Sequence, residues 1–171
     1  ISAADKERAR KHFQSGRKYA GQENWNKAIE EYKKALRLNP EDYEVHFHLG
    51  TLYIRLVLKG KYEFLDKALA EFETTIKFKP DYAIAYFLTA MTYEKQNSQE
   101  SIDKAIKYYQ KYLSLEDPEN IKAKMAETKI KQLTELKAKT QKLREAIKNN
   151  PQDVKAYVEL GNIYFWQPEF Q

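Results

Sequence analysis

The sequence predicts an all-α protein built as a row of helix hairpins, and three observations support this prediction. Lys, Glu, Ala, Leu and Gln fill the positions between apolar residues, which favours helix, and the 171 residues include only five Gly and five Pro. Apolar residues recur three and four positions apart, which is the helical spacing. Similar segments also return along the chain, and such self-similarity is typical of repeat architectures.

The first helix of each predicted hairpin carries an eight-residue segment that returns along the chain. Its first residue is His or Tyr, its fifth is small, and its last is Tyr. The small residue predicts a point where two helix axes approach closely. The copies are HFQSGRKY (12–19), HFHLGTLY (46–53), YFLTAMTY (86–93) and YVELGNIY (157–164), with a fainter copy, AKMAETKI, at 123–130.

The second helix of each predicted hairpin carries a longer segment that begins with a large apolar residue and ends at Pro. Pro stops a helix because it cannot donate the helical hydrogen bond. Three copies have Ala at the fourth place and an aromatic at the eighth, which is predicted to fill the wedge beside the close contact. The copies are WNKAIEEYKKALRLNP (25–40), LDKALAEFETTIKFKP (65–80), IDKAIKYYQKYLSLEDP (102–118) and LKAKTQKLREAIKNNP (136–151).

Together these segments resemble the tetratricopeptide repeat (TPR), whose 34-residue pattern is aromatic-x2-Leu-Gly-x2-Tyr, then Ala-x3-aromatic, then Pro. The resemblance covers residues 9–171, or about four and a half repeats of this kind. It implies a right-handed superhelical solenoid of antiparallel helix hairpins. The predicted repeats are 9–42, 43–82, 83–119, 120–153 and a partial repeat at 154–171.

Three repeats depart from the pattern, and in the third Ala90 and Ala105 are 15 positions apart, three more than in the first. Gly50 and Ala68 are 18 positions apart, six more than in the first repeat, so both helices of the second hairpin are expected to be about a turn longer, with Gly60 at the tip. The fourth repeat lacks the small residues and any turn breaker, so it forms either a hairpin or one unbroken helix. We expect the hairpin, because Leu136 occupies the place where Trp25 and Leu65 begin their helices.

The residues of the chain do not form a recognisable catalytic, cofactor or metal motif. There is no Gly-rich phosphate loop, no His-Glu-x-x-His, and no Ser or Cys nucleophile in a known setting. His12 and His46 occupy a predicted packing position between helices. His46 and His48 point about 200° apart on a helix, so they cannot share one metal ion. We therefore expect no enzymatic activity, no cofactor and no metal site.

The family resemblance implies a binding groove along the first helices, where a peptide or helix of another protein lies. The residue after each His or Tyr position is predicted to face inward, as are those four and seven positions later. Exposed apolar residues gathered in a groove mark an interaction site. The alternative is that the Phe residues of this set pack between helices. The predicted partner-binding residues are Phe13, Arg17, Phe47, Thr51, Ile54, Phe87, Met91, Lys124, Lys131 and Val158.

The predicted function is that of a non-enzymatic protein–protein interaction scaffold. In this family a clamp of Lys, Asn and Arg holds the free carboxylate of chaperone tails. The matching positions here are Phe13, Arg17, His48, Ile84 and Leu88, so apart from the charge of Arg17 that clamp is absent. Residues 120–149 contain nine Lys or Arg and three acids, but no aromatic to stack a base, so we do not expect nucleic acid as the partner.

The closing stretch YVELGNIYFWQPEFQ (157–171) predicts the first helix of a fifth repeat and its turn. Because its aromatic face lacks a second helix, we expect a break in an array, or another surface that covers it. The alternative function is accordingly an assembly piece that binds a copy of itself or a neighbouring domain through its ends. No apolar run is long enough to span a membrane. A soluble, cytoplasmic protein is expected, while an exported or tethered form stays open because the chain begins at Ile and reads as truncated.

Overall fold

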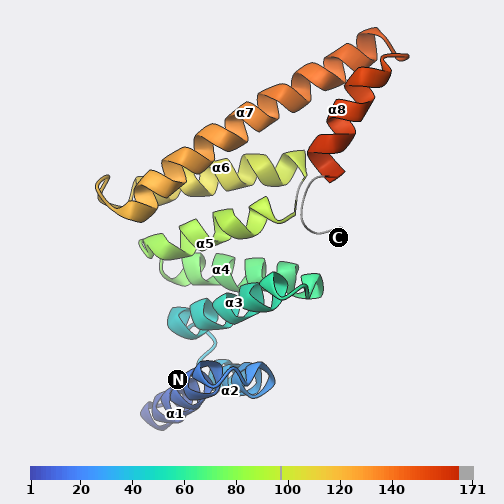
Figure 1. Ribbon diagram of the computed structural model, residues 1–171. Coiled ribbons are helices and arrows are strands. Elements are labelled where there is room, and N and C mark those ends of the chain that lie inside the picture. Colours follow the sequence, from blue (N-terminus) through green and yellow to red (C-terminus); the bar gives the residue numbers. More distant parts are fainter. Residues whose placement is uncertain (97, 166–171) are drawn as a thin grey trace.

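The computed structural model describes residues 1–96 and 98–165, and these form eight α-helices and one short 3₁₀ helix (Figure 1). No strand occurs in this part of the chain, so the predicted all-α class is confirmed. The elements are α1 (Ala3–Gly21), α2 (Trp25–Leu38), α3 (Tyr43–Leu58), η1 (Tyr62–Phe64), α4 (Leu65–Phe78), α5 (Ala83–Glu94), α6 (Gln99–Leu113), α7 (Ile121–Asn149) and α8 (Val154–Phe165).

Three hairpins, α1/α2, α3/α4 and α5/α6, stack one on the next along the molecule (Figure 1). The second helix of each hairpin packs against the first helix of the following one. The first helices also contact each other, α1 with α3 and α3 with α5, more closely than α2 contacts α4. The first helices therefore lie together on one side of the stack, which is the side where a groove is expected.

The predicted close approaches within hairpins are confirmed at two glycines. A Cβ atom on Gly16 would lie 2.5 Å from ring carbons of Tyr32, and one on Gly50 would lie 2.8 Å from Phe72. Both rings are buried, so an added Cβ atom would push a packed aromatic ring out of its place. A Cβ atom on Gly161 would lie within 4 Å of no side chain or other helix of the described chain, so the close approach predicted there is not formed by these residues.

The second hairpin places its extra residues differently from the prediction. Helix α3 ends eight residues after Gly50, whereas α1 ends five after Gly16, so the part of α3 that follows the small residue is longer by about a turn, although α3 as a whole has 16 residues and α1 has 19. Gly60 has a φ of +85° and sits in the turn that follows, also as expected. The prediction for α4 is wrong, because α4 has 14 residues like α2. The other extra residues of this hairpin include η1. The ring of Phe64 in η1 stacks on that of Tyr53, with 5.4 Å between the ring centroids.

The predicted hairpin in the fourth repeat is wrong, because α7 runs unbroken for 29 residues (Figure 1). Its first half packs on α6 and its second half on α8, as the two helices of a closed repeat would do with their neighbours. Only the contact between the two halves is lost. Glu127 and Lys139 occupy the small positions that a closed hairpin needs, Lys124 replaces the packing Phe, and no Gly or Pro interrupts the middle.

Candidate functional site

The three Phe residues of the predicted groove do not form an exposed column. Phe13 and Phe87 are only 8% and 5% exposed, and Phe47 is half-buried. Each ring packs against the aromatic residue of its own second helix, with Phe13 5.9 Å from Tyr32 and Phe87 5.5 Å from Tyr109 between ring centroids. The alternative stated for these side chains, packing between helices, therefore describes Phe13 and Phe87.

The predicted Arg17, Thr51 and Met91 are exposed or half-buried, but in place of the predicted Phe column the outward-facing residues are those one position later, Gln14, His48 and Leu88. One residue turns a helix by about 100°, so this offset moves the exposed line onto a different face. We call this line the groove stripe, and its residues are exposed or half-buried in every first helix. The groove stripe consists of Arg10, Gln14, Arg17, Glu44, His48, Thr51, Arg55, Ile84, Leu88, Met91, Ile121, Met125, Thr128 and Gln132.

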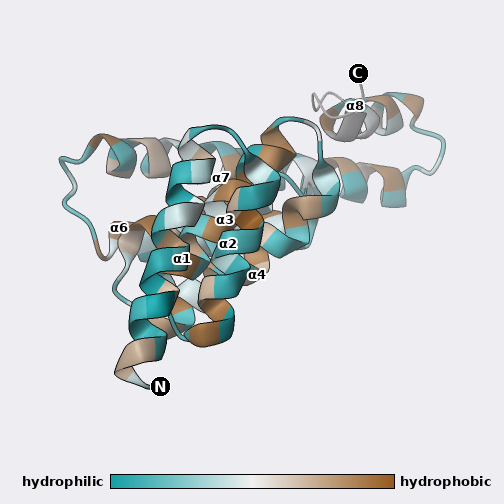
Figure 2. Ribbon diagram, turned by 90° about the horizontal axis from the view of Figure 1, so that it is seen from below, coloured by the Kyte–Doolittle hydropathy of each residue, from teal (hydrophilic) through white to brown (hydrophobic). Residues whose placement is uncertain are grey.

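The chemistry of the groove stripe changes along the stack. On α1 and α3 its residues are polar and include three Arg and one acid, and Figure 2 shows α1 as largely hydrophilic. On α5 and α7 they are mostly apolar, and Ile121 is 77% exposed. Ile121 and Met125 border a shallow cavity of about 420 Å³ together with Lys124 and Thr128. The groove stripe therefore has a basic half and an apolar half.

The other predicted site residues lie in different surroundings. Arg17 is exposed, with its guanidinium 5.8 Å from the centre of the Phe13 ring. Ile54 packs against the core of the first two hairpins. Lys124 forms an ion pair of 2.9 Å with Glu119. Thr51 and Met91 belong to the groove stripe, whereas Lys131 and Val158 are exposed away from it.

A second cavity lies where α1, α2 and α3 meet, and we call it the Tyr32 cavity. Its volume is about 160 Å³. Burial raises the pKa of Tyr32 to about 12, so the phenol stays protonated at neutral pH and can donate a hydrogen bond. Burial and the nearby Arg17 lower the pKa of His48, so its ring is neutral. The lining residues are Ala20, Gly21, Trp25, Tyr32, His48, Thr51, Leu52 and Arg55.

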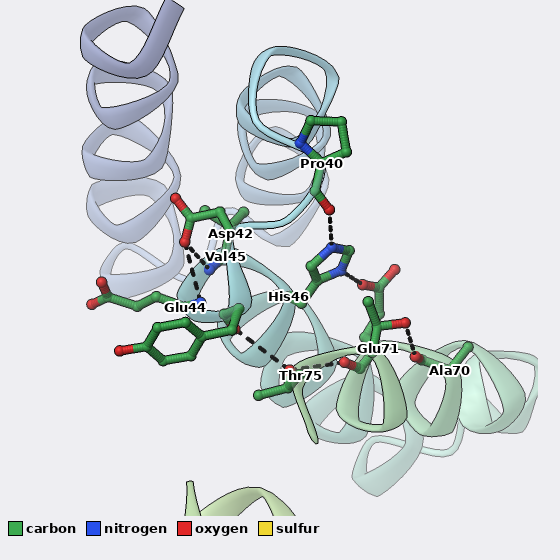
Figure 3. A network of polar contacts seen from close by, with 10 residues as sticks. Pro40, Asp42, Glu44, Val45, His46, Ala70, Glu71 and Thr75 are labelled. Atoms are coloured by element: carbon green, nitrogen blue, oxygen red, sulfur yellow. Dashed lines mark hydrogen bonds and ion pairs between the residues drawn. The ribbon is translucent and has the colours of Figure 1, made fainter. Parts of the chain in front are cut away.

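The side chain of His46 in α3 forms hydrogen bonds with α4 and with the turn that precedes α3 (Figure 3). Its Nδ1 lies 2.6 Å from Glu71 Oε2, and its Nε2 lies 2.9 Å from the carbonyl oxygen of Pro40. Both partners only accept hydrogen bonds, so both ring nitrogens donate when the ring is protonated. At the same repeat position, the Tyr86 hydroxyl donates to the Pro80 carbonyl at 2.9 Å.

His46 is expected to make the protein less stable as pH rises above neutrality. Burial lowers the pKa of His46, but the bonds to Glu71 and Pro40 raise it more, so its folded-state pKa exceeds the usual value. The contribution of the charged ring is therefore complete below the unfolded-state pKa of about 6.5 and is lost as pH rises through the folded-state pKa. Urea denaturation should show a loss of roughly 1–2 kcal/mol across this window.

The control for this pH dependence is His46→Tyr, which copies Tyr86 and can keep the bond to Pro40 without titrating near neutrality. The pH-dependent loss should disappear in this variant. His48, whose pKa is lowered, acts with the opposite sign at pH values below about 6.5 and does not interfere. An unchanged profile in His46→Tyr would show that another group causes the effect.

The C-terminal part of the described chain exposes a second apolar face. Val154, Tyr157 and Val158 are exposed on α8. The predicted aromatic residues Trp166 and Phe170 lie outside the described residues. None of the described helices is long and apolar enough to cross a membrane, and the described His, Asp and Glu side chains form no cluster of three or more that could hold a metal ion.

Comparisons with known proteins support the same architecture. Residues 16–57 match the family model described as TPR repeat, and no curated protein matches the chain. The TPR domain of P58(IPK) is 20% identical with a TM-score of 0.74, covering 91% of this chain and 40% of that one. The MamA protein is 19% identical with a TM-score of 0.64, and the alignment covers 93% of this chain and 82% of that one.

A third solved structure is the first TPR of Spaghetti (RPAP3) bound to the HSP90 peptide SRMEEVD. It is 21% identical with a TM-score of 0.64, and the alignment covers 78% of this chain and 95% of that one. The resemblance predicted from the sequence is confirmed by these matches.

Proposed function

Because the chain carries tetratricopeptide repeats and has their fold, we propose that it is a non-enzymatic scaffold that binds a segment of a partner protein along the groove stripe. The observation that carries this proposal is the exposed apolar half of the groove stripe on α5 and α7. Met91, Ile121 and Met125 are exposed there, whereas the other large apolar residues of the two helices are buried or half-buried. Exposed apolar side chains gathered on one face usually mark an interaction site.

The two halves of the groove stripe define the chemistry of the partner. A segment with acidic residues over α1 and α3 and apolar residues over α5 and α7 would complement both halves. The peptide bound by the Spaghetti (RPAP3) domain also combines acidic and apolar residues. However, Ile84 and Leu88 replace two cations of the clamp known in this family, so the partner contacts at α5 are apolar rather than ionic.

A peptide-display selection against the full chain tests this proposal. The enriched peptides should combine acidic and apolar residues, and Met125→Glu or Arg17→Glu should weaken their binding in calorimetry at least about tenfold, or about 1.4 kcal/mol. The matched control is Leu58→Glu, because Leu58 is an exposed apolar residue outside the groove stripe. Peptides that bind all three variants as tightly as the original chain would exclude the groove stripe as the binding surface.

The second candidate function is self-association through α8, whose exposed Val154, Tyr157 and Val158 would otherwise contact water. Light scattering over a range of protein concentrations tests it. A mass that rises with concentration, and that returns to the monomer value in Val158→Glu, supports association through this face. A monomer at every concentration excludes it.

A further inference from the structure

We infer that the Tyr32 cavity is a subsite for one carboxylate group of the partner segment, held by the Tyr32 hydroxyl and by the guanidinium group of Arg55. The inference rests on the proposed function, since the carboxylate belongs to a segment that lies in the groove. It adds a defined anchor to the basic half of the groove stripe. The subsite adjoins the groove stripe at His48, Thr51 and Arg55, where the first two repeats meet.

The first observation is an unpaired hydroxyl group. Tyr32 is only 1% exposed, yet it lines the cavity and its hydroxyl forms no hydrogen bond within the described chain. The hydroxyl oxygen is not among the fully buried atoms that lack a partner, so it remains accessible from the cavity, where water or a ligand can complete its hydrogen bonding. The Tyr32 hydroxyl is a donor that faces an open space.

The third repeat shows the same site with an internal occupant. Tyr109 occupies the place of Tyr32, because it follows Ala105 by four residues as Tyr32 follows Ala28, and its hydroxyl donates to the carboxylate of Glu94. Glu94 also forms an ion pair of 2.8 Å with Lys129 of the following helix. In the first repeat Ala20 occupies the place of Glu94. Its side chain is too short to reach the Tyr32 hydroxyl, and the space beside it is the Tyr32 cavity. A carboxylate from outside would restore the arrangement seen in the third repeat.

The charge around the cavity favours an anion. Arg55 and His48 line it, none of its lining residues is acidic, and the charges of Arg17 and Arg55 both act on Tyr32. Within residues 1–96 and 98–165 neither arginine forms an ion pair. Guanidinium groups match the geometry of carboxylates and bind them strongly. A volume of about 160 Å³ admits a carboxylate group but not a large side chain.

His48 provides a direct signal for occupation of the cavity. Burial and the charge of Arg17 lower its pKa, and an anion bound beside Arg55 would oppose the effect of the positive charge. The ring of His48 lies 6.2 Å from that of Tyr32, so its NMR resonances should report on the site. The probes are three blocked peptides: acetyl-Gly-Gly with a free C-terminal carboxylate, acetyl-Gly-Asp-Gly-amide, and acetyl-Gly-Asn-Gly-amide as the uncharged control.

At least one carboxylate peptide should shift the His48 resonances in a saturable way and raise the pKa of His48, while the Asn peptide should not. The peptide that binds identifies the source of the carboxylate as a chain end or an acidic side chain. Tyr32→Phe removes only the free hydroxyl and should weaken this binding about tenfold. Absence of a saturable shift with both carboxylate peptides, or equal binding of the Asn peptide, would overturn the subsite.

Ala20→Glu and Ala20→Gln form a matched pair of variants. The new carboxylate of Ala20→Glu should accept the Tyr32 hydroxyl as Glu94 accepts that of Tyr109, raise the pKa of His48 and abolish peptide binding. Ala20→Gln should leave the pKa of His48 unchanged. An equal pKa of His48 in both variants would contradict the inference. A display-selected partner that still binds Tyr32→Phe normally would leave the groove function intact while excluding the subsite.

Discussion

Phe72→Ala is expected to lower the free energy of unfolding by about 3–5 kcal/mol, which is typical of deleting a fully buried aromatic ring. Phe72 is 0% exposed and fills the wedge between α3 and α4. Its ring lies where a Cβ atom on Gly50 would be only 2.8 Å away, and its centroid is 6.1 Å from that of Phe47. Neither helix can close the resulting cavity without moving the contacts on its other face.

Urea denaturation followed by circular dichroism measures this loss. The matched control is Tyr62→Ala, because Tyr62 is an exposed aromatic residue in η1 of the same repeat, and its loss should stay below about 1 kcal/mol. A Phe72→Ala loss as small as that of the control would mean that the wedge position does not hold the hairpin together.

The sequence was sufficient to predict the hairpins because their signals are local. The spacing between Gly16 and Ala28 sets where two helices touch, and the aromatic four residues after the Ala fills the remaining space. Pro40 and Pro80 follow α2 and α4 by two residues, as predicted for helix stops. Each of these rules involves residues of one hairpin, so one repeat contains all the information.

The groove could not be placed correctly from the repeat pattern alone. A shift of one residue rotates the exposed line by about 100°, and the pattern does not fix that angle. Phe13 was placed in the groove because it is apolar and regularly spaced, but the same properties suit a wedge between α1, α2 and α3. The column one residue later, with Gln14 and His48 in the first two repeats, was the more polar one and therefore the better indication of an exposed face.

The Tyr32 cavity was missed for a different reason. The sequence identifies Tyr32 as a wedge residue, and the structure confirms that it is buried. Whether its hydroxyl is satisfied depends on the residue at the place of Ala20, on another helix. In the third repeat, Glu94 accepts the hydrogen bond of the corresponding hydroxyl, that of Tyr109. Comparison of Tyr32 with Tyr109, and of Ala20 with Glu94, contains the signal, but its meaning depends on the packing that brings these pairs together.

Gly16→Ala and Gly161→Ala are expected to change stability in opposite directions, although both glycines occupy the same place in the repeat. At Gly16 the new methyl group would lie 2.5 Å from the buried Tyr32 ring, so the free energy of unfolding should fall by about 1–3 kcal/mol. At Gly161 the space is open within the described chain, so the better helix propensity of Ala should raise the stability of α8 by about 0.5–1 kcal/mol.

Urea denaturation measures the global loss for Gly16→Ala, and amide hydrogen exchange along α8 measures the local gain for Gly161→Ala, since distant repeats need not unfold together. The comparison separates helix propensity, which is the same at both glycines, from the close approach, which only Gly16 makes. A gain at both positions would mean that α1 and α2 do not need the glycine to reach their packing distance. A loss at Gly161 would instead mean that a further surface packs on α8 in solution, as the alternative function requires.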